Sequence, residues 1–382
     1  MRHRLNIAFF GSSLVSAYWN GAATYYRGII RALHDRGHRV TFYEPDAYDR
    51  QKHRDIEDPP WAEVVVYEPG DLGAVERAVR SAAKACHLLV KCSGVGVNDA
   101  FLEEAVAQAS SPALRAFWDV DAPATLDRVQ ADSADPFRPL IAQFDLILTY
   151  GGGQPVIDAY RALGAQRCVP IYNALDPATH HPVAPDDRFS ADLAFLGNRL
   201  PDREARVEQF FLQPAAACPD KTFLLGGSGW QDKPMPANVR YAGHIYTRDH
   251  NAFNCTPLAV LNISRQSMAD YGFSPATRVF EAAGAAACVI TDAWVGIEQF
   301  LEPGREVLVA HSGQEVLDHL LKLDAEVARQ IGLAAQRRVL AHHTYAQRAV
   351  QLEDLLFDAL GTGRPATVAR SRARKKMQGI AP

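Results

Sequence analysis

The sequence lacks the segments that would place it in a membrane or a fibre. No apolar run in its 382 residues approaches the roughly 20 residues that a membrane-spanning helix needs. The first apolar stretch, Leu5 to Phe10, is shorter than the core of a signal peptide and is typical of a first strand. Glycine and proline are near their average content, which excludes a collagen-like or largely disordered chain. We therefore expect a globular cytoplasmic protein of two or three domains, at about 150 residues per domain.

Cysteine is scarce and is not arranged for metal or redox chemistry. The six cysteines form no C-x-x-C pair, so neither a zinc site nor a thioredoxin-type site is expected. Most of them lie in apolar stretches, which indicates buried free thiols in a reducing compartment. The adjacent histidines His180 and His181 are not expected to act jointly, because neighbouring side chains point in different directions.

Basic residues are in excess only at the C-terminal end. The net charge is −4, but residues 362–382 hold six basic residues and no acidic one. The preceding 361 residues carry 34 basic and 44 acidic residues, a net charge of −10. An acidic body argues against a nucleic-acid partner and requires local features to hold any anionic ligand. The tail is predicted to be disordered and solvated, with a weak contact to a membrane surface or an acidic partner as the alternative.

Apolar strands and helical patterns alternate through both halves of the chain. In the first half the expected strands are 5–10, 40–43, 64–67, 87–91, 115–118 and 144–149. A proline-punctuated segment without periodicity follows, which we interpret as an interdomain linker over 171–190. The rhythm then restarts, with expected strands at 193–196, 222–225, 239–242, 259–263 and 287–291. This alternation predicts an α/β fold with parallel sheets, which bind ligands outside the carboxyl ends of their strands.

Two common nucleotide-binding motifs are absent. The loop that begins at Gly11 keeps only one glycine of the G-x-G-x-x-G fingerprint. Glu44 resembles the ribose-binding acid of dinucleotide folds, but one glycine and one acid do not make that motif. The glycine-rich segment 226–229 is followed by Trp-Gln-Asp rather than Lys-Ser/Thr, so it is no Walker A loop.

A stronger constellation lies at 274–284. Ser274 is a plausible N-cap with Pro275 at the first helical position, which predicts a helix start with free N–H groups and a positive dipole end. Such a helix end suits a pyrophosphate. Thr277 and Arg278 in the first turn can add donors, and Glu281 lies about one turn further on, where its carboxylate could accept both hydroxyls of a ribose. The alternative is an ordinary capped helix with a surface arginine and glutamate.

This stretch and its flanks resemble the C-terminal half of GT-B glycosyltransferases, with the CgeB-like (spore-maturation-protein-like) branch as the closest group. The segments that carry the resemblance are 172–177, 195–199, 225–230, 239–244, 250–254, 274–284, 288–292 and 296–306. It covers most of residues 145–355, whereas the first 110 residues share only the rhythm of strands and helices.

The resemblance implies two Rossmann-like domains that face each other across a cleft. The acceptor side would be residues 1–170, and the nucleotide-sugar-binding domain would be 191–344. A last helix over 345–361 would return to the first domain. In such chains basic residues and a helix N-terminus, rather than a metal, stabilise the leaving diphosphate.

By the same resemblance, most donor contacts come from the second domain. The implied donor-binding residues are Gly197, Asn198, Arg199, Gly243, His244, Ile245, Ser274, Thr277, Arg278 and Glu281. Arg203 and Arg265 are further phosphate candidates, for which a solvated salt bridge is the alternative. On the acceptor side, Gly11, Trp19 and Gly21 in the first loop are predicted contacts, although packing is the commoner fate of such a tryptophan.

The catalytic prediction falls on Asp119 and Asp121, which follow a strand on the ligand edge of the first domain. A carboxylate there could deprotonate an acceptor hydroxyl. The alternatives are an aspartate that caps the next loop or pairs with Arg128, and a D-x-D metal site is not expected. Many retaining GT-B enzymes carry a second glutamate eight positions before Glu281, where this chain has Phe273, so the retaining mechanism is not carried over.

We therefore predict a metal-independent glycosyltransferase without a cofactor. Its donor would be a nucleoside-diphosphate sugar, a UDP-sugar first among them, and its acceptor a hydroxyl of a glycan, small molecule or protein. The alternatives are a nucleotide-sugar epimerase of the same fold and a non-catalytic nucleotide-sugar-binding protein.

Overall fold

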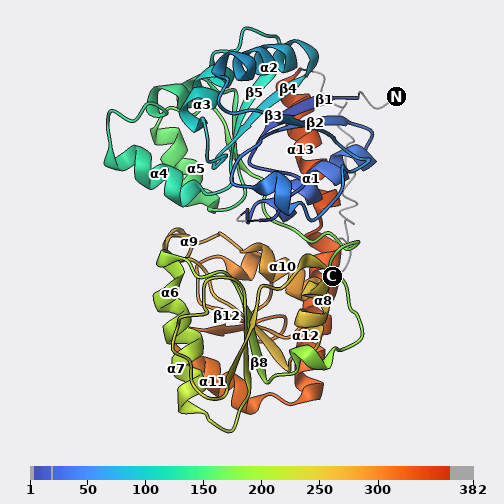
Figure 1. Cartoon of the computed structure of the whole chain (residues 1–382), viewed down its shortest axis with the longest axis vertical. Coiled ribbons are helices and arrows are strands. Elements are labelled where there is room, and N and C mark those ends of the chain that lie inside the picture. The colour runs from blue at the N-terminus through green and yellow to red at the C-terminus, as the bar shows by residue number, and fades with distance from the viewer. Residues whose placement is uncertain (1–3, 19, 362–382) are drawn as a thin grey trace, which may run out of the picture.

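The computed structural model describes residues 4–18 and 20–361, so Trp19 and the basic tail from Thr362 onward lie outside the described residues. Two α/β domains lie one above the other along the long axis of the molecule (Figure 1). No helix in the described ranges is long and apolar enough to span a membrane.

The first domain is built on a seven-stranded parallel sheet in the order β3-β2-β1-β4-β5-β6-β7. Its strands are β1 (Asn6–Phe10), β2 (Arg39–Pro45), β3 (Glu63–Tyr67), β4 (Leu88–Cys92), β5 (Leu114–Asp119), β6 (Leu146–Thr149) and β7 (Cys168–Pro170). Successive side chains of a strand enter opposite cores: Phe9 and Trp118 lie in one apolar cluster, Phe10 and Phe117 in the other. This two-sided burial explains why the strands read as nearly continuous apolar runs.

The second domain repeats the plan with six parallel strands in the order β10-β9-β8-β11-β12-β13. The strands are β8 (Leu193–Leu196), β9 (Phe223–Gly226), β10 (Val239–Gly243), β11 (Ala259–Asn262), β12 (Val289–Asp292) and β13 (Leu308–Ala310). The α/β fold of two Rossmann-like domains predicted from the sequence is confirmed. The strands that the sequence missed, β7 and β13, have only three residues each, too few to show a periodic pattern.

Helices cover both faces of each sheet (Figure 1). In the first domain they are α1 (Ala23–Asp35), α2 (Leu72–Ala85), α3 (Asp99–Ala107), α4 (Ala122–Ala131) and α5 (Gly153–Ala162). In the second they are α6 (Pro201–Val207), α7 (Gln213–Ala217), α8 (His250–Cys255), α9 (Gln266–Tyr271), α10 (Thr277–Gly284), α11 (Gly313–Lys322) and α12 (Ala325–His342). A π-helical turn at Glu208–Leu212 directly follows α6.

The chain crosses between the sheets twice. It passes from β7 to β8 through residues 171–192, and the last helix, α13 (Tyr345–Ala359), lies on the first domain against α1. Thr344 and Gln347 form a capping box at its start. Tyr345 packs on Gly28 of α1, where any Cβ would overlap its ring. Further along, the buried Glu353 forms an ion pair with Arg36. These contacts tie the C-terminal helix to the N-terminal domain.

Candidate functional site

The carboxyl ends of the two sets of strands meet at the boundary between the domains. α9 and α10 lie at the top of the second domain, next to the first (Figure 1). Arg265, just before α9, forms a 2.7 Å ion pair with Asp121 of the first domain. The Gly152 N–H donates to the carbonyl of Phe273 at 2.8 Å. Because parallel α/β sheets bind ligands at this edge, a ligand site is expected at the domain boundary.

Three arginines of the second domain gather at this boundary. Burial lowers the pKa of Arg203, and the nearby charge of Arg265 lowers it further. Burial also lowers the pKa of Arg278. The Nε atom of Arg203 is buried without a hydrogen-bond partner, whereas Arg278 donates to Asn254 Oδ1 at 3.0 Å. An arginine held in this state has unused donors, and a phosphate is the group that guanidinium donors match well.

Arg265, by contrast, is already paired. Its Nη1 lies 2.7 Å from Asp121 and its Nε 2.6 Å from Asp202. Arg265 therefore forms a salt bridge between the domains, and its Nη1 and Nε donors are already used. The salt bridge is the alternative that the sequence had left open for this residue.

The loop after β8 lies close to the loop after β9. Asn198 Oδ1 accepts from the Ser228 N–H at 2.9 Å, and Trp230 Nε1 donates to the Gly197 carbonyl at 2.7 Å. At Gly227, with φ of +118°, a Cβ would overlap the Gly197 carbonyl. The glycine at position 227 therefore allows the two loops to approach closely. Gly197 and Asn198 directly follow β8, the first strand of this domain.

Arg199 is already paired with carboxylates. It forms a two-pronged ion pair with Glu204, at 2.8 and 2.9 Å, and a further one with Asp232 at 3.0 Å. Arg203, four residues later in α6, has a buried Nε without a hydrogen-bond partner instead. Arg203 lies close to the loop after β8, because its Nη1 would touch a Cβ placed at Gly197.

The helix start at 274–277 differs from the prediction. α10 begins at Thr277 with Ala276 as its N-cap, so the predicted cap at Ser274 is wrong. Ser274 precedes a proline, which disfavours helical backbone there. Its hydroxyl donates to the Gly272 carbonyl at 2.9 Å instead of capping the helix. The helix N-terminus, with Thr277 and Arg278 in its first turn, is still present, two residues later than expected.

Glu281 is buried beside two histidines that the sequence did not connect to it. His180 Nε2 is 3.9 Å from Glu281 Oε1, and Arg278 Nη2 is 3.9 Å from Oε2. One nitrogen each from His180 and His250 and one oxygen of Glu281 lie within 4.8 Å of one another. Burial alone would raise the pKa of Glu281, but His180, Arg278 and His250 outweigh it and lower the pKa. Glu281 is thus held as a carboxylate.

The predicted base-binding segment, Gly243 to Ile245, lies next to His250. Gly243 has φ of +72°, and its carbonyl accepts from the Gly227 N–H at 2.8 Å. Ile245 is buried and its carbonyl lies 3.3 Å from His250 Nε2. His244 is exposed, and its ring stands edge-on to Tyr246 at 4.7 Å between centroids.

The two predicted catalytic aspartates have different environments. Asp119 is fully buried, accepts from Tyr160 at 2.5 Å and from the Asp121 N–H at 3.0 Å, and has its pKa raised by burial. Its Oδ1 also accepts from Thr125 in the first turn of α4. Asp119 is thus placed as the loop-capping residue that was the alternative, whereas Asp121 faces Arg265 across the domain boundary.

The acceptor-side prediction is only partly described. Gly11 packs under the ring of Phe42, with no room for a Cβ, and Gly21 has open space around it. Glu44, which resembled a ribose-binding acid, accepts from Ser13 Oγ and the Leu14 N–H at 3.0 and 2.6 Å. Its role is to hold the loop after β1.

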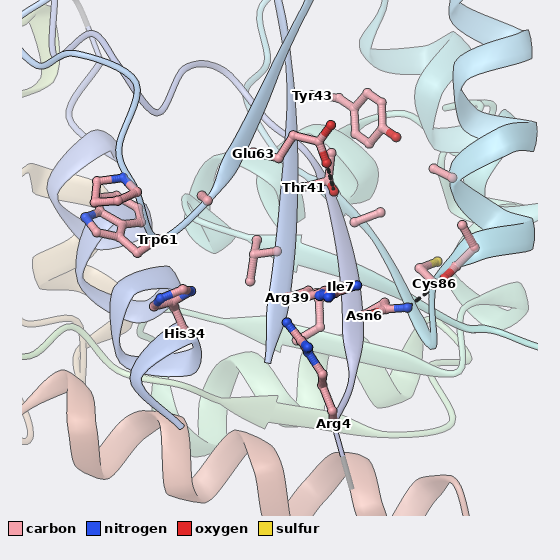
Figure 2. A pocket seen from close by; sticks show the side chains of 16 residues that line it. Arg4, Asn6, Ile7, His34, Arg39, Thr41, Tyr43, Trp61, Glu63 and Cys86 are labelled. Carbon is pink, nitrogen blue, oxygen red and sulfur yellow. Dashed lines mark hydrogen bonds between the residues drawn. The ribbon is translucent and has the colours of Figure 1, made fainter. Parts of the chain in front are cut away.

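A separate pocket lies elsewhere on the described surface. Figure 2 shows a pocket of about 480 Å³ lined by Arg4, His34, Arg39, Trp61 and Glu63, among others. Arg39 and Glu63 are the first residues of β2 and β3. The pocket therefore lies at the amino ends of the strands, on the edge of the sheet opposite the domain boundary.

Comparison with known proteins supports this assignment of the architecture. A family model described as glycosyl transferase-like matches residues 203–354. Sucrose-phosphate synthase from Thermosynechococcus elongatus superposes with a TM-score of 0.71 at 14% identity, over 94% of this chain and 100% of that one. The chain has a GT-B fold.

Other solved structures with this fold contain a nucleotide sugar. HepE from Anabaena in complex with UDP-glucose matches with a TM-score of 0.65 at 16% identity, over 93% of this chain and 100% of that one. The T4 phage enzyme BGT in complex with its UDP-glucose substrate gives 0.58 at 10% identity, over 93% and 99%. No curated protein matches the sequence. At these identities the likeness establishes the GT-B fold, not a substrate.

Proposed function

We propose that the protein is a glycosyltransferase that takes a sugar from a nucleoside-diphosphate donor and attaches it to an acceptor hydroxyl. The observation that carries the proposal is the arginine cluster beside Glu281. Arg203 and Arg278 have little access to solvent, and the buried Nε of Arg203 has no partner. A cationic pocket next to a buried carboxylate suits a ligand that is anionic at one end and carries hydroxyls at the other.

The comparisons support the same proposal. The family match covers all three of Arg203, Arg278 and Glu281. UDP-sugars are the first donors to test, because two of the matched structures are described with UDP-glucose. The segments at 195–199 and 274–284 favour the CgeB-like branch. The six unpaired cysteines support a cytoplasmic location.

In this proposal the leaving diphosphate is stabilised without a metal. Arg203 and Arg278 would supply charge-assisted hydrogen bonds, and the N-terminal turn of α10 with Thr277 would add backbone donors. Gly197 and Asn198 would border the phosphates, and Gly243 to Ile245 the base. Approach of the domains would exclude water, which limits hydrolysis of the donor.

Asp121 is the proposed general base for the acceptor hydroxyl. Its Oδ1 is buried without a hydrogen-bond partner while Oδ2 is paired with Arg265. Asp119 would act as a positioning residue, since it holds the turn that carries Asp121. The acceptor would then lie against the loop after β1, near Gly11 and Gly21. The acidic body favours a glycan, small molecule or protein over nucleic acid as acceptor.

A nucleotide-sugar screen tests the proposal directly. UDP, GDP and TDP sugars would be added to the full chain and the rise in melting temperature measured, since a ligand that binds only the folded state stabilises it by about 2.7 kcal/mol at a hundredfold excess over Kd. Mass spectrometry would then follow sugar transfer to a panel of acceptors. Failure of every nucleotide to bind would refute the site, and isomerised sugar without an acceptor would identify an epimerase instead.

A further inference from the structure

The pocket in Figure 2 plays no part in the proposed function. It has a volume of about 480 Å³, and Asn6, Arg39 and Glu63, the first residues of β1, β2 and β3, all line it. It therefore lies at the edge of the first sheet that is opposite the domain boundary. Ligand pockets commonly have volumes of about 300–1,000 Å³, so this one can hold a small metabolite.

The offset between two strands and a set of small side chains leave this space open. β3 begins at Glu63, which pairs with Thr41, so the first two residues of β2 have no strand beside them on that side. The lining includes four alanines, Ala8, Ala62, Ala82 and Ala85. Larger side chains at these positions would fill the space, because protein interiors are otherwise closely packed.

Cationic side chains predominate in the lining. Arg4, Arg39 and His34 contribute to it, against Glu63 as its one acidic residue. In Figure 2 both arginine side chains lie in the middle of the pocket. Neither guanidinium group forms an ion pair or a side-chain hydrogen bond with the residues that the structure describes. Because the first 361 residues carry a net charge of −10, a pair of arginines without a carboxylate is a local exception, and it favours an anionic ligand.

The acidic residue of the pocket already has a partner of its own. Glu63 Oε2 accepts from the Thr41 hydroxyl at 3.1 Å, as the dashed line in Figure 2 shows. A carboxylate has room for further donors, so Glu63 can also accept from a hydroxyl group of a ligand. The pocket thus offers guanidinium donors and a carboxylate acceptor.

Trp61 adds an aromatic ring to these polar groups. It follows two prolines, whose fixed backbone angle restricts the turn, and the Ala62 N–H donates to the Pro59 carbonyl at 3.4 Å. The ring is half-buried, packs against the apolar core and also lines the pocket. An anionic group, hydroxyls and a ring in one ligand would match the arginines, Glu63 and Trp61.

The helix ends at this pocket give no help to an anion. His34 lies in the last turn of α1, and Ala85 is the last residue of α2. A helix C-terminus carries the negative end of the helix dipole. The two arginines must therefore supply most of the attraction for an anion, so their removal should abolish binding.

We propose that this pocket is a second ligand site, which binds a small phosphate ester that carries hydroxyls and a ring. Its phosphate would lie between Arg4 and Arg39, because guanidinium donors match phosphate oxygens in geometry and charge. Its hydroxyls would donate to Glu63, and its ring would pack against Trp61. The site goes beyond the proposed function and does not depend on it.

Calorimetry with three probes tests the site. AMP, ribose 5-phosphate and inorganic phosphate would be titrated into the full chain, Arg4→Gln, Arg39→Gln and the double variant. At least one of the two esters is expected to bind the wild-type chain, about tenfold or more weakly to each single variant, and not detectably to the double variant. Tighter binding of AMP would assign the Trp61 contact to a base, and equal binding of both esters to the sugar ring.

Two control variants separate this pocket from other cationic surfaces. Arg161→Gln removes an exposed arginine of α5 in the same domain and should leave ester affinity unchanged. Arg203→Met alters the domain boundary and should leave it unchanged as well. Arg4 and Arg39 are both exposed, so melting temperatures of their variants should equal that of the wild-type chain.

Three results would overturn the inference. They are failure of both esters to bind, ester affinity that the double variant keeps, and an equal loss of affinity in Arg161→Gln. A loss in Arg203→Met alone would place the ester at the domain boundary and likewise remove the second site. The proposed function is judged separately, since it fails only if UDP and the other donor nucleotides do not bind.

Discussion

Polar side chains at the carboxyl edges of the two sheets are used in different ways. In the first domain, the buried carboxylates of Glu44 and Asp119 each accept three hydrogen bonds from their own surroundings. On the other side of the boundary, Arg203 and His250 of the second domain and His180 of the crossover segment each keep a buried nitrogen without a partner. Because an unpaired buried polar group costs about 1–3 kcal/mol, such atoms mark the place that a ligand completes. In the proposed function, these unpaired nitrogens would belong to the donor site.

Asp121 differs from Glu44 and Asp119, because its buried Oδ1 has no hydrogen-bond partner. It is also the residue that reaches Arg265 in the second domain. The comparison therefore separates Asp121, a candidate for chemistry, from Asp119 two positions earlier, which is part of the framework.

The largest effect is expected from Asp121→Asn. Loss of a general base should lower kcat about 10²–10⁴-fold, while UDP affinity, measured by calorimetry, changes little. Asp119→Asn should instead lower the free energy of unfolding by about 1–3 kcal/mol, since an amide placed among donors leaves one of them unpaired. If kcat is unchanged in Asp121→Asn, another group deprotonates the acceptor.

Arg203→Met should weaken UDP binding about a hundredfold, because charge-assisted hydrogen bonds to phosphate are among the strongest. The effect should appear in Kd and leave the melting temperature of the free protein nearly unchanged or raised, since the variant removes an unpaired buried atom. Arg329→Met is the matched control, because Arg329 is exposed on α12 and pairs only with Glu326. Equal loss in both variants would point to net charge rather than to a site.

A pH effect of intermediate size is expected from His250. Burial lowers its folded-state pKa to about 4, below the unfolded value of about 6.5, so the unfolded chain binds a proton first as the pH falls. The stabilisation is complete above pH 6.5 and declines toward pH 4, with a loss of about 2 kcal/mol between pH 7 and pH 5. Urea unfolding at several pH values checks this, and His250→Leu should flatten the slope.

Part of that slope should persist in His250→Leu. Burial also lowers the pKa of His343 to about 4, so this second histidine contributes in the same direction. His181→Leu, which alters an exposed ring, should leave the slope as it is in the wild-type chain. A slope that His250→Leu does not change would mean that His250 is protonated alike in both states.

Glu44→Gln tests whether a buried carboxylate of the first domain contributes to stability but not to donor binding. Its carboxylate accepts from Ser13, the Leu14 N–H and Gln51, so replacing one oxygen by an NH₂ group should cost about 1–2 kcal/mol of unfolding free energy. UDP affinity should stay within about twofold, because the residue holds a loop and not the donor. Glu76→Gln on the exposed face of α2 is the control. A large loss of UDP affinity in Glu44→Gln alone would show that the first domain shares the donor pocket.

The features that could be predicted from the sequence are those whose residues lie close together along the chain. Strands buried on both faces read as apolar runs, and Arg278 and Glu281 stand within one helix, so the fold and part of the site were accessible. The N-cap is Ala276 rather than the predicted Ser274, because Pro275 disfavours helical backbone at the residue before it and the Ser274 hydroxyl donates to the Gly272 carbonyl.

The histidines show what sequence reasoning could not reach. His180 and His250 are 70 positions apart and belong to a crossover segment and a short helix. They meet only because Gly284 lets the crossover lie on α10. A contact that depends on a missing Cβ three residues after Glu281 leaves no periodic pattern, although the glycine itself is a signal of close backbone approach.

The smallest effect is expected from Arg199→Met. This variant tests whether Arg199 binds the diphosphate, as the resemblance implies, or only forms ion pairs, as in the structure. The resemblance implies that Arg199 binds the diphosphate, but its guanidinium is already held by Glu204 and Asp232. Partly exposed ion pairs of this kind contribute little, so UDP affinity should change by less than about threefold, with a slight fall in the urea midpoint. The two variants, Arg199→Met and Arg203→Met, should be measured under the same conditions, so that their UDP affinities can be compared directly. If Arg199→Met loses as much affinity as Arg203→Met, then Arg199 must leave its two carboxylates when the donor arrives, and unpaired atoms in the donor-free protein would no longer be a sufficient guide to the site.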